Sequence, residues 1–145
     1  MAGRESLKAT PTRYFVFDTS VLIDQLRTNR FAGIAWSVSG VIRHSVVAIA
    51  ELYRGARTRA DRRMIDELAR QRPVLTPTRE MWLYSGRILA RLADRQPLNS
   101  DTLRRLHFDL LIALTARGIG AAVVTTDRTH FELLQKEVPF SLVVW

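Results

Sequence analysis

Short apolar runs alternate along the chain with longer segments in which apolar residues recur at helical spacing. Strands are expected at residues 14–17, 41–44, 73–78, 121–127 and 140–145. Helices are expected at residues 20–26, 46–54, 58–72, 79–96, 102–120 and 128–137. Strands this short and apolar, alternating with helices, indicate a mainly parallel sheet covered on both faces. We therefore expect an α/β fold in which the carboxyl ends of the strands share one edge.

Hydroxyl side chains stand where several of these helices begin. Such a side chain caps a helix by accepting a hydrogen bond from a backbone amide of the first turn. The expected caps are Thr19 or Ser20, Ser45, Thr58 and Thr78. The helix at residues 58–72 also has an apolar stripe that is expected to face the core, and it consists of Met64, Ile65, Leu68 and Ala69.

The length of 145 residues fits a single domain. Residues 1–13 are polar and contain Pro11, so they are expected to form a flexible tail before a domain at residues 14–145. No apolar run approaches the length of a membrane span, and the first residues lack the apolar segment of a signal peptide. The chain has no cysteine, which excludes disulfides and thiolate metal sites and fits a cytoplasmic protein.

The chain is strongly basic, with a formal net charge of +8 that comes mainly from arginine. Arginine makes bidentate contacts with phosphate and with carboxylate groups, so the charge favours nucleic acid or an acidic protein segment as a partner. The alternative is that a GC-rich genome supplies many arginine codons. The charge alone does not separate these two interpretations.

Four acidic residues are expected at one end of the sheet. Asp18 and Asp127 each follow a predicted strand, Glu51 lies in the helix after the second strand, and Asp109 lies in the otherwise apolar stretch "HFDLLIALTA". Each has a structural alternative: Asp18 and Asp127 can cap helices or form turns, and Glu51 can pair with a surface arginine. Asp109 is harder to explain in that way, because an unpaired acid on an apolar helix face costs several kcal/mol.

Carboxylates that converge in this way need a positive charge between them. Two of them ~4 Å apart repel by roughly 4 kcal/mol at an effective dielectric constant near 20. Mg²⁺, or Mn²⁺ in its place, accepts such oxygen ligands, activates a bound water and neutralises charge on a phosphate. A phosphodiester hydrolase site is therefore expected. Zinc is disfavoured, because His44, His107 and His130 do not pair with one another at ligand spacing.

Three segments resemble the motifs of PIN domains, and their order resembles VapC, the toxin of bacterial type II toxin–antitoxin pairs. The segments are "FVFDTSVLIDQL", "SVVAIAELYRGA" and "FDLLIALTARGIGAAVVTTDRTHF". The resemblance implies a PIN-like three-layer α/β/α domain and a Mg²⁺- or Mn²⁺-dependent endoribonuclease that cuts single-stranded RNA. It implies catalytic roles for Asp18, Glu51, Asp109 and Asp127, with Asp18 and Asp109 as metal ligands. Thr125 and Thr126 match the hydroxyl residue that usually precedes the fourth acid.

The resemblance also implies partners. VapC-like toxins form homodimers, and a VapB antitoxin silences them within a hetero-oligomer by filling the active-site groove. The arginine-rich stretch at residues 54–72 is either a surface that follows RNA phosphates or a solvated helix face. Trp36, Tyr53, Trp82 and Trp145 either stack on bases or pack against the core.

Two other functions fit parts of the pattern. An aspartate-based phosphatase or phosphoryl receiver also has an Asp after its first strand, but the phosphatase needs a second Asp where Ser20 stands. The receiver needs a late lysine, for which Lys136 is a poor candidate. A non-catalytic PIN-like module would bind RNA or a protein without cutting, and the presence of all four acids argues against it.

Overall fold

A computed structural model describes residues 13–28, 40–70 and 73–145 of the chain. Its sheet has the strand order β3-β2-β1-β4-β5, and every neighbouring pair is parallel. The strands are β1 (Tyr14–Phe17), β2 (Val41–Ser45), β3 (Val74–Leu75), β4 (Ala122–Thr125) and β5 (Ser141–Val144). The predicted parallel sheet is confirmed. The predicted tail, except Arg13, and the predicted role of Trp36 lie outside the described residues.

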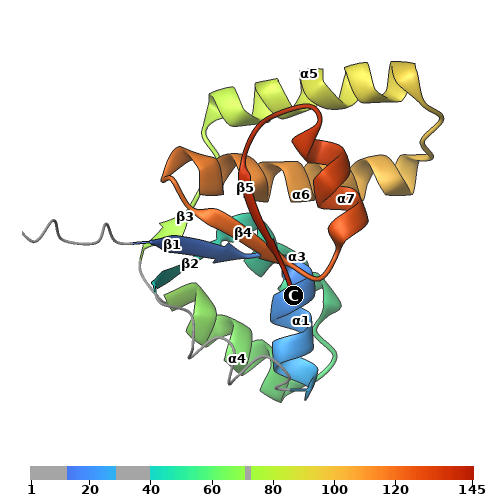
Figure 1. Cartoon of the computed structure of the whole chain (residues 1–145). Coiled ribbons are helices and arrows are strands. Elements are labelled where there is room, and N and C mark those ends of the chain that lie inside the picture. The colour runs from blue at the N-terminus through green and yellow to red at the C-terminus, as the bar shows by residue number, and fades with distance from the viewer. Residues whose placement is uncertain (1–12, 29–39, 71–72) are drawn as a thin grey trace, which may run out of the picture.

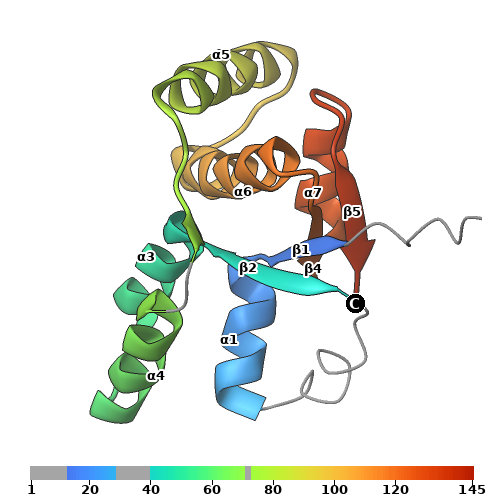
Figure 2. The same cartoon turned by 90° about the vertical axis from the view of Figure 1, so that its left-hand side faces the viewer.

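Helices cover both faces of the sheet and give the predicted three layers (Figure 1). Figure 2 shows α1, α3 and α4 below the sheet and α5, α6 and α7 above it. The helices are α1 (Thr19–Thr28), α3 (Val46–Gly55), α4 (Arg59–Arg70), α5 (Arg79–Arg95), α6 (Ser100–Gly118) and α7 (Arg128–Gln135). No helix among these described segments is long and apolar enough to cross a membrane.

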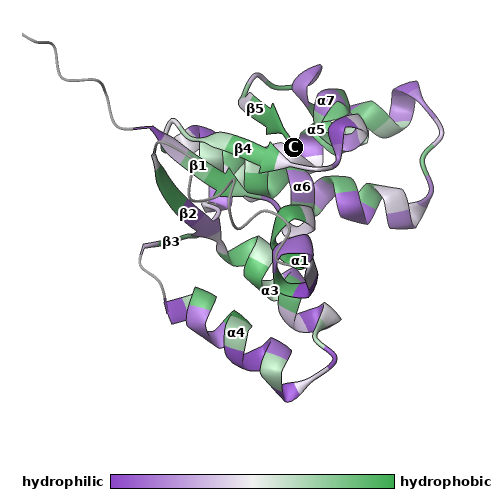
Figure 3. Ribbon diagram, turned by 60° about the horizontal axis from the view of Figure 1, so that its bottom comes forward, coloured by the Kyte–Doolittle hydropathy of each residue, from purple (hydrophilic) through white to green (hydrophobic). Residues whose placement is uncertain are grey.

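Helix α6 is buried along two of its sides. Leu111 and Ile112 belong to the core around β1 and β4, whereas Leu110 and Leu114 pack with residues of α5 and α7 in a second cluster. The central strands are mostly hydrophobic in Figure 3, and α4 is largely hydrophilic. Two-sided burial fixes the position of α6 relative to the sheet, and α6 carries Asp109.

Two local predictions were wrong. Thr19 and Ser20 do not cap α1, because the Asp18 carboxylate accepts the hydrogen bond from the Val21 amide instead. Of the expected apolar stripe on α4, only Ile65 is fully buried and Leu68 is half-buried, while the other two members, Met64 and Ala69, are exposed. Helix α4 lies at the edge of the fold and packs mainly against α3, so its apolar side is narrower than the sequence suggests.

The other caps agree with the sequence. Ser45 Oγ accepts a hydrogen bond from the Val47 amide, and the hydroxyls of Thr58 and Thr78 accept equivalent bonds in α4 and α5. Helix α6 begins at Ser100, two residues before the predicted start, because the Asn99 side chain accepts a hydrogen bond from the Thr102 amide. These differences at helix ends leave the sheet edge unchanged.

Gly40 gives a test of the close contact between β1 and the segment that enters β2. A Cβ atom at Gly40 would lie 2.5 Å from the Arg13 carbonyl oxygen and 2.7 Å from Cε2 of Phe15. The Arg13 carbonyl is also needed by the Val41 amide, to which it is bonded at 2.8 Å. We expect Gly40→Ala to lower the free energy of unfolding by about 1–3 kcal/mol, measured by urea denaturation.

Gly86 is the matched control for this experiment. It lies in α5, and a Cβ atom there would meet no atom within 4 Å. Gly86→Ala should therefore stabilise the protein by up to about 1 kcal/mol through helix propensity. Equal effects of the two substitutions would contradict the close contact at Gly40.

Candidate active site

The pairing of β1 with β4 brings Asp18 next to Thr125. The Asp18 amide donates to the Val124 carbonyl at 3.0 Å, which continues the ladder beyond the end of β1. Thr125 Oγ1 donates to Asp18 Oδ2 at 2.7 Å and accepts from the Asp127 amide at 2.9 Å. One hydroxyl thus connects the two acids that follow the central strands.

Asp18 is also tied to the start of α1. Its Oδ1 accepts from the Val21 amide at 3.1 Å and from Ser20 Oγ at 2.7 Å. Ser20 Oγ in turn accepts from the amide and the hydroxyl of Thr126. Asp18 as a whole residue is only 2% exposed. Asp18 therefore caps the helix and also stands at the sheet edge, so the two interpretations of this residue are compatible.

Helices bring the other two acids to the same place. Glu51 on α3 accepts from the Thr19 hydroxyl at 2.8 Å, and Asp109 projects from α6 with a side chain that is 15% exposed. The negative charge of Asp109 acts on both Asp18 and Glu51, and that of Asp127 acts on Asp109. The four acids predicted from the sequence therefore form one cluster at the carboxyl ends of the strands.

His130 is a member of this cluster that the sequence analysis missed. Its Nδ1 lies 3.3 Å from Asp109 Oδ2 and 3.2 Å from Asp127 Oδ2. The Asp127 carboxylate also accepts a hydrogen bond from the His130 amide at 3.1 Å. The signal was available in the sequence: His130 stands three residues after Asp127 at the start of a helix, where positions i and i+3 share a face.

Burial makes this cluster expensive to ionise. It raises the pKa of Asp18 to about 6, while hydrogen bonds from Thr125, Ser20 and the Val21 amide oppose the shift. Burial also raises the pKa of Glu51 and of Asp109. The pKa of His130 is raised mainly by its hydrogen bond to Asp109. A group of acids that holds protons in this way is stabilised by a bound cation.

The donor atoms fit a divalent cation. One ligand atom from each of Asp109, Asp127 and His130 lies within 4.8 Å of the others, and Asp18 lies within the electrostatic reach of Asp109. Carboxylate oxygens are the ligands that Mg²⁺ and Mn²⁺ take in proteins. Of the two ligands expected from the sequence, Asp109 belongs to this group, whereas Asp18 lies near it and stays a prediction as a ligand.

Positive charges lie beside the acids. The Arg54 guanidinium lies over the Phe108 ring, 5.8 Å from its centre, and both line a hollow of about 220 Å³ with Asp101, Arg104 and Arg105. Burial raises the pKa values of Glu51 and Asp109. The positive charge of Arg54 opposes the rise at Glu51, and that of Arg105 opposes the rise at Asp109. The acids therefore lie beside a basic rim that suits a polyanion.

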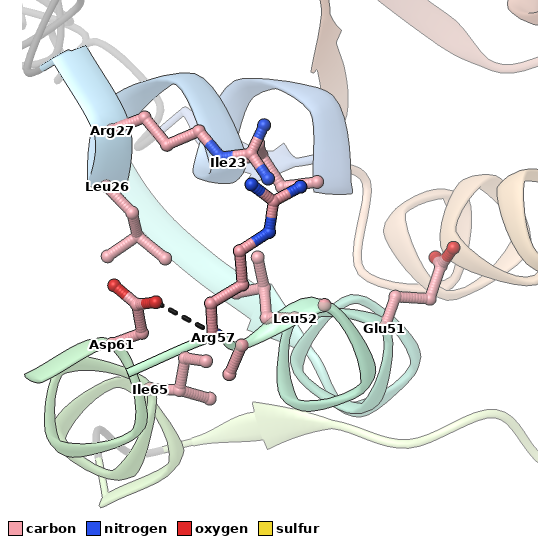
Figure 4. Close-up of a pocket in the computed structure, with 10 residues that line it drawn as sticks. Ile23, Leu26, Arg27, Glu51, Leu52, Arg57, Asp61 and Ile65 are labelled. Carbon is pink, nitrogen blue, oxygen red and sulfur yellow. Dashed lines mark hydrogen bonds between the residues drawn. The ribbon is translucent and has the colours of Figure 1, made fainter. Parts of the chain in front are cut away.

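A groove of about 80 Å³ runs between α1, α3 and α4 (Figure 4). Its walls are mostly apolar and include Ile23, Leu26, Leu52, Ala56 and Ile65. Arg27, Arg57 and Asp61 add charged groups. Figure 4 shows Glu51 at one end with its carboxylate pointing away from the groove and toward α6. The groove and the acidic cluster are therefore neighbours.

The aromatic residues proposed for base stacking have different environments. Trp145 packs against Phe17 with ring centres 5.3 Å apart, which supports the packing alternative for this residue. Tyr53 and Trp82 are exposed. The Tyr53 hydroxyl donates a hydrogen bond to the Asp66 carboxylate, and the Trp82 ring is in edge contact with His107.

Comparisons with known proteins agree with the fold. The sequence model of the PIN domain matches residues 15–136. Among solved structures, VapBC2 from Rickettsia felis, bound to a promoter DNA fragment, is 16% identical with a TM-score of 0.66 and covers 91% of this chain and 98% of its own. DNA-bound VapBC from Salmonella typhimurium is 22% identical with a TM-score of 0.67, over 92% and 99% of the two chains.

A third solved structure has the highest sequence identity of these three. VapBC-5 from Mycobacterium tuberculosis, described as a member of the VapBC family of toxin–antitoxin systems, is 25% identical with a TM-score of 0.59. The match covers 90% of this chain and 96% of that chain. No curated protein matches the chain.

The raised pKa of Asp18 predicts a pH-dependent gain of stability in Asp18→Asn. The folded protein holds the Asp18 proton up to about pH 6, whereas the unfolded chain loses it near 3.8, so ionisation costs stability progressively as the pH rises between these values. Asparagine removes this cost, but it weakens the hydrogen bond that Thr125 donates to the Asp18 carboxylate. In EDTA at pH 7.5 we expect Asp18→Asn to unfold at a higher urea concentration, with a gain of about 1–2 kcal/mol.

The gain should shrink toward pH 4, where Asp18 is protonated in the folded wild-type protein. Asp94→Asn, an exposed acid on α5, is the control and should show no such pH-dependent gain. A gain at Asp18 that is equal at both pH values would contradict the electrostatic explanation.

Proposed function

Because the chain belongs to the PIN-domain family, we propose that it is a metal-dependent endoribonuclease and the toxin of a VapBC-type toxin–antitoxin pair. The observation that carries the proposal is the cluster of Asp18, Glu51, Asp109 and Asp127 at the carboxyl ends of parallel strands. The names of the similar solved structures support the toxin role.

Asp18 and Asp109 are the proposed ligands of a Mg²⁺ or Mn²⁺ ion, with Asp127 beside them. When bound, such an ion lowers the pKa of a water molecule and neutralises charge that develops on a phosphate. The hydrogen bonds from Thr125, Ser20 and the Val21 amide hold the Asp18 carboxylate in one orientation. Preorganised ligands of this kind need no rearrangement when the substrate arrives.

Glu51 is the proposed acceptor of the proton from the attacking water. Burial raises its pKa, which makes its carboxylate a stronger base than that of a free glutamate. The hydroxyl of Thr19 holds one of its oxygens at 2.8 Å. Thr19 therefore has a positioning role in this scheme, since it acts through Glu51.

RNA is the proposed substrate because the cluster is bordered by Arg54 and Arg105 near the partly exposed ring of Phe108. These cations can hold the phosphates that flank the one being cut, and the ring can stack on an unpaired base. Stacking requires bases that are not paired, which favours single-stranded regions. An RNA target inside the cell also makes the cytoplasm the proposed location.

The direct test is cleavage of a mixed pool of single-stranded RNA. The wild-type protein should cut in the presence of Mg²⁺ or Mn²⁺ and stop when EDTA is added. Asp18→Asn and Asp109→Asn should each reduce the rate at least about 100-fold, since loss of a ligand is at least as harmful as loss of a group that orients one. The products are followed on denaturing gels.

Asp94→Asn is the matched control and should cut at the wild-type rate, because Asp94 is exposed on α5. Circular dichroism of each variant shows whether the fold is kept. If folded Asp109→Asn cuts as fast as the wild type, the proposed site is wrong.

We propose that a VapB-like antitoxin binds in the groove between α1, α3 and α4. An apolar segment would fit the walls of the groove, and a basic side chain at its end would reach the acids beyond Glu51. The proposed assembly is a hetero-oligomer built on a toxin homodimer.

Leu26→Glu should weaken binding of the antitoxin, because it places a charge in the apolar wall of the groove. The measurement is co-purification with the product of the reading frame beside the gene, with light scattering to give the stoichiometry. Leu83→Glu is the control, since Leu83 is an exposed leucine on α5, on the opposite face of the sheet. Equal recovery of the partner with both variants would contradict this placement.

A further inference from the structure

His130 is held in a defined position between two elements of the fold. Asp127 caps α7 by accepting a hydrogen bond from the His130 amide, and α7 packs against α6. The imidazole then lies against Asp109, with 23% of its side chain exposed. Neither the fold nor the core needs a histidine here, because the Asp127 cap uses only the backbone of residue 130.

The contacts of the imidazole are unusual for a simple hydrogen bond. One nitrogen, Nδ1, faces two carboxylate oxygens from different residues, at 3.3 Å and 3.2 Å. A single N–H has one proton, so it cannot form a good bond with both oxygens at once. Nδ1 and the two carboxylate oxygens thus form a group of three possible ligand atoms that lie close to one another.

The distances agree with an octahedral ion. Ligand atoms about 2.1 Å from an ion lie about 3.0 Å apart when they are adjacent in an octahedron. The two distances from Nδ1 are close to this value, and the three ligand atoms lie within 4.8 Å of one another. Small side-chain movements would bring all three to ligand distance.

The nitrogen affects the choice of ion. Mg²⁺ is a hard cation that takes oxygen ligands and keeps several waters, whereas first-row transition ions accept an imidazole nitrogen readily. Mn²⁺ accepts both the carboxylates and the imidazole in octahedral geometry. A site made of Asp109, Asp127 and His130 should therefore discriminate between two ions that an all-carboxylate site would bind alike.

We propose that His130 is a ligand of the divalent ion through Nδ1, together with Asp109 and Asp127, and that it makes the site prefer Mn²⁺ to Mg²⁺. The inference rests on the proposed function, because it concerns the ion that the nuclease would use. It goes beyond that function by adding His130 and Asp127 as ligands and by choosing between the two ions.

The test measures metal binding directly and uses no RNA. Binding of Mn²⁺ to the full chain is followed from the electron paramagnetic resonance signal of free Mn²⁺, and Mg²⁺ affinity is measured by competition. We expect His130→Gln to weaken Mn²⁺ binding at least about 10-fold and to change Mg²⁺ binding less than about 3-fold. His107→Gln is the matched control and should change neither, since His107 bonds to Ser85 on the far side of α6.

A spectroscopic signature separates ligation from a merely structural role. Pulsed resonance spectra of Mn²⁺ bound to the wild-type protein should show coupling to an imidazole ¹⁴N nucleus. This coupling should persist in His107→Gln and disappear in His130→Gln. If His130→Gln does not fold, coupling that persists in both His107→Gln and His44→Gln assigns the nitrogen to His130, because the chain has three histidines.

The outcomes distinguish this inference from the proposed function. Bound Mn²⁺ without ¹⁴N coupling in the wild type, or an absence of Mn²⁺ binding, would overturn the role of His130. If the coupling is present but no RNA is cut, His130 is a metal ligand and the proposed nuclease function fails. If RNA is cut and the coupling is absent, only the inference about His130 fails.

Discussion

The pairing of β1 with β4 is the constraint on which the site depends. Because the strands are parallel and in register, Asp18 leaves β1 at the level where Thr125 ends β4. The Thr125 hydroxyl then bonds to Asp18 and accepts from the Asp127 amide. A shift of one residue between these strands would turn Thr125 to the other face of the sheet and separate the acids.

The arrangement that brings the acids together for the proposed activity also lowers the stability of the folded protein. Four acids and a histidine are gathered where burial raises the pKa values of Asp18, Glu51 and Asp109. A core without these charges would be more stable, and the hydrogen bonds around Asp18 lessen the cost without removing it. Many enzymes have a site that lowers the stability of the empty protein but binds its ligand well. The cluster of acids is a site of this kind.

The sequence indicates the main parts of the site because they follow strand ends. Asp18 and Asp127 could be located from two apolar strands, and Asp109 from an acid within an apolar helix. For Glu51 the sequence leaves two interpretations open, since a helical glutamate beside arginines fits the surface equally well. The order of the strands could not be derived, because it depends on which long-range pairs bury most surface.

The errors have physical reasons as well. The sequence predicts a hydroxyl cap for α1, with Asp18 as an alternative. The structure has Asp18 as the cap, because Thr19 donates to Glu51 and Ser20 donates to Asp18, and the Asp18 carboxylate accepts from the Val21 amide. His130 was considered only beside other histidines, and its partners are acids, one of them on another helix. Helix α6 sits between two apolar clusters, so its middle turns cannot loosen locally without opening both. Asp109 lies on this helix and is therefore held at a fixed place relative to both clusters, so the acidic site has one rigid side against which substrate and partner can bind.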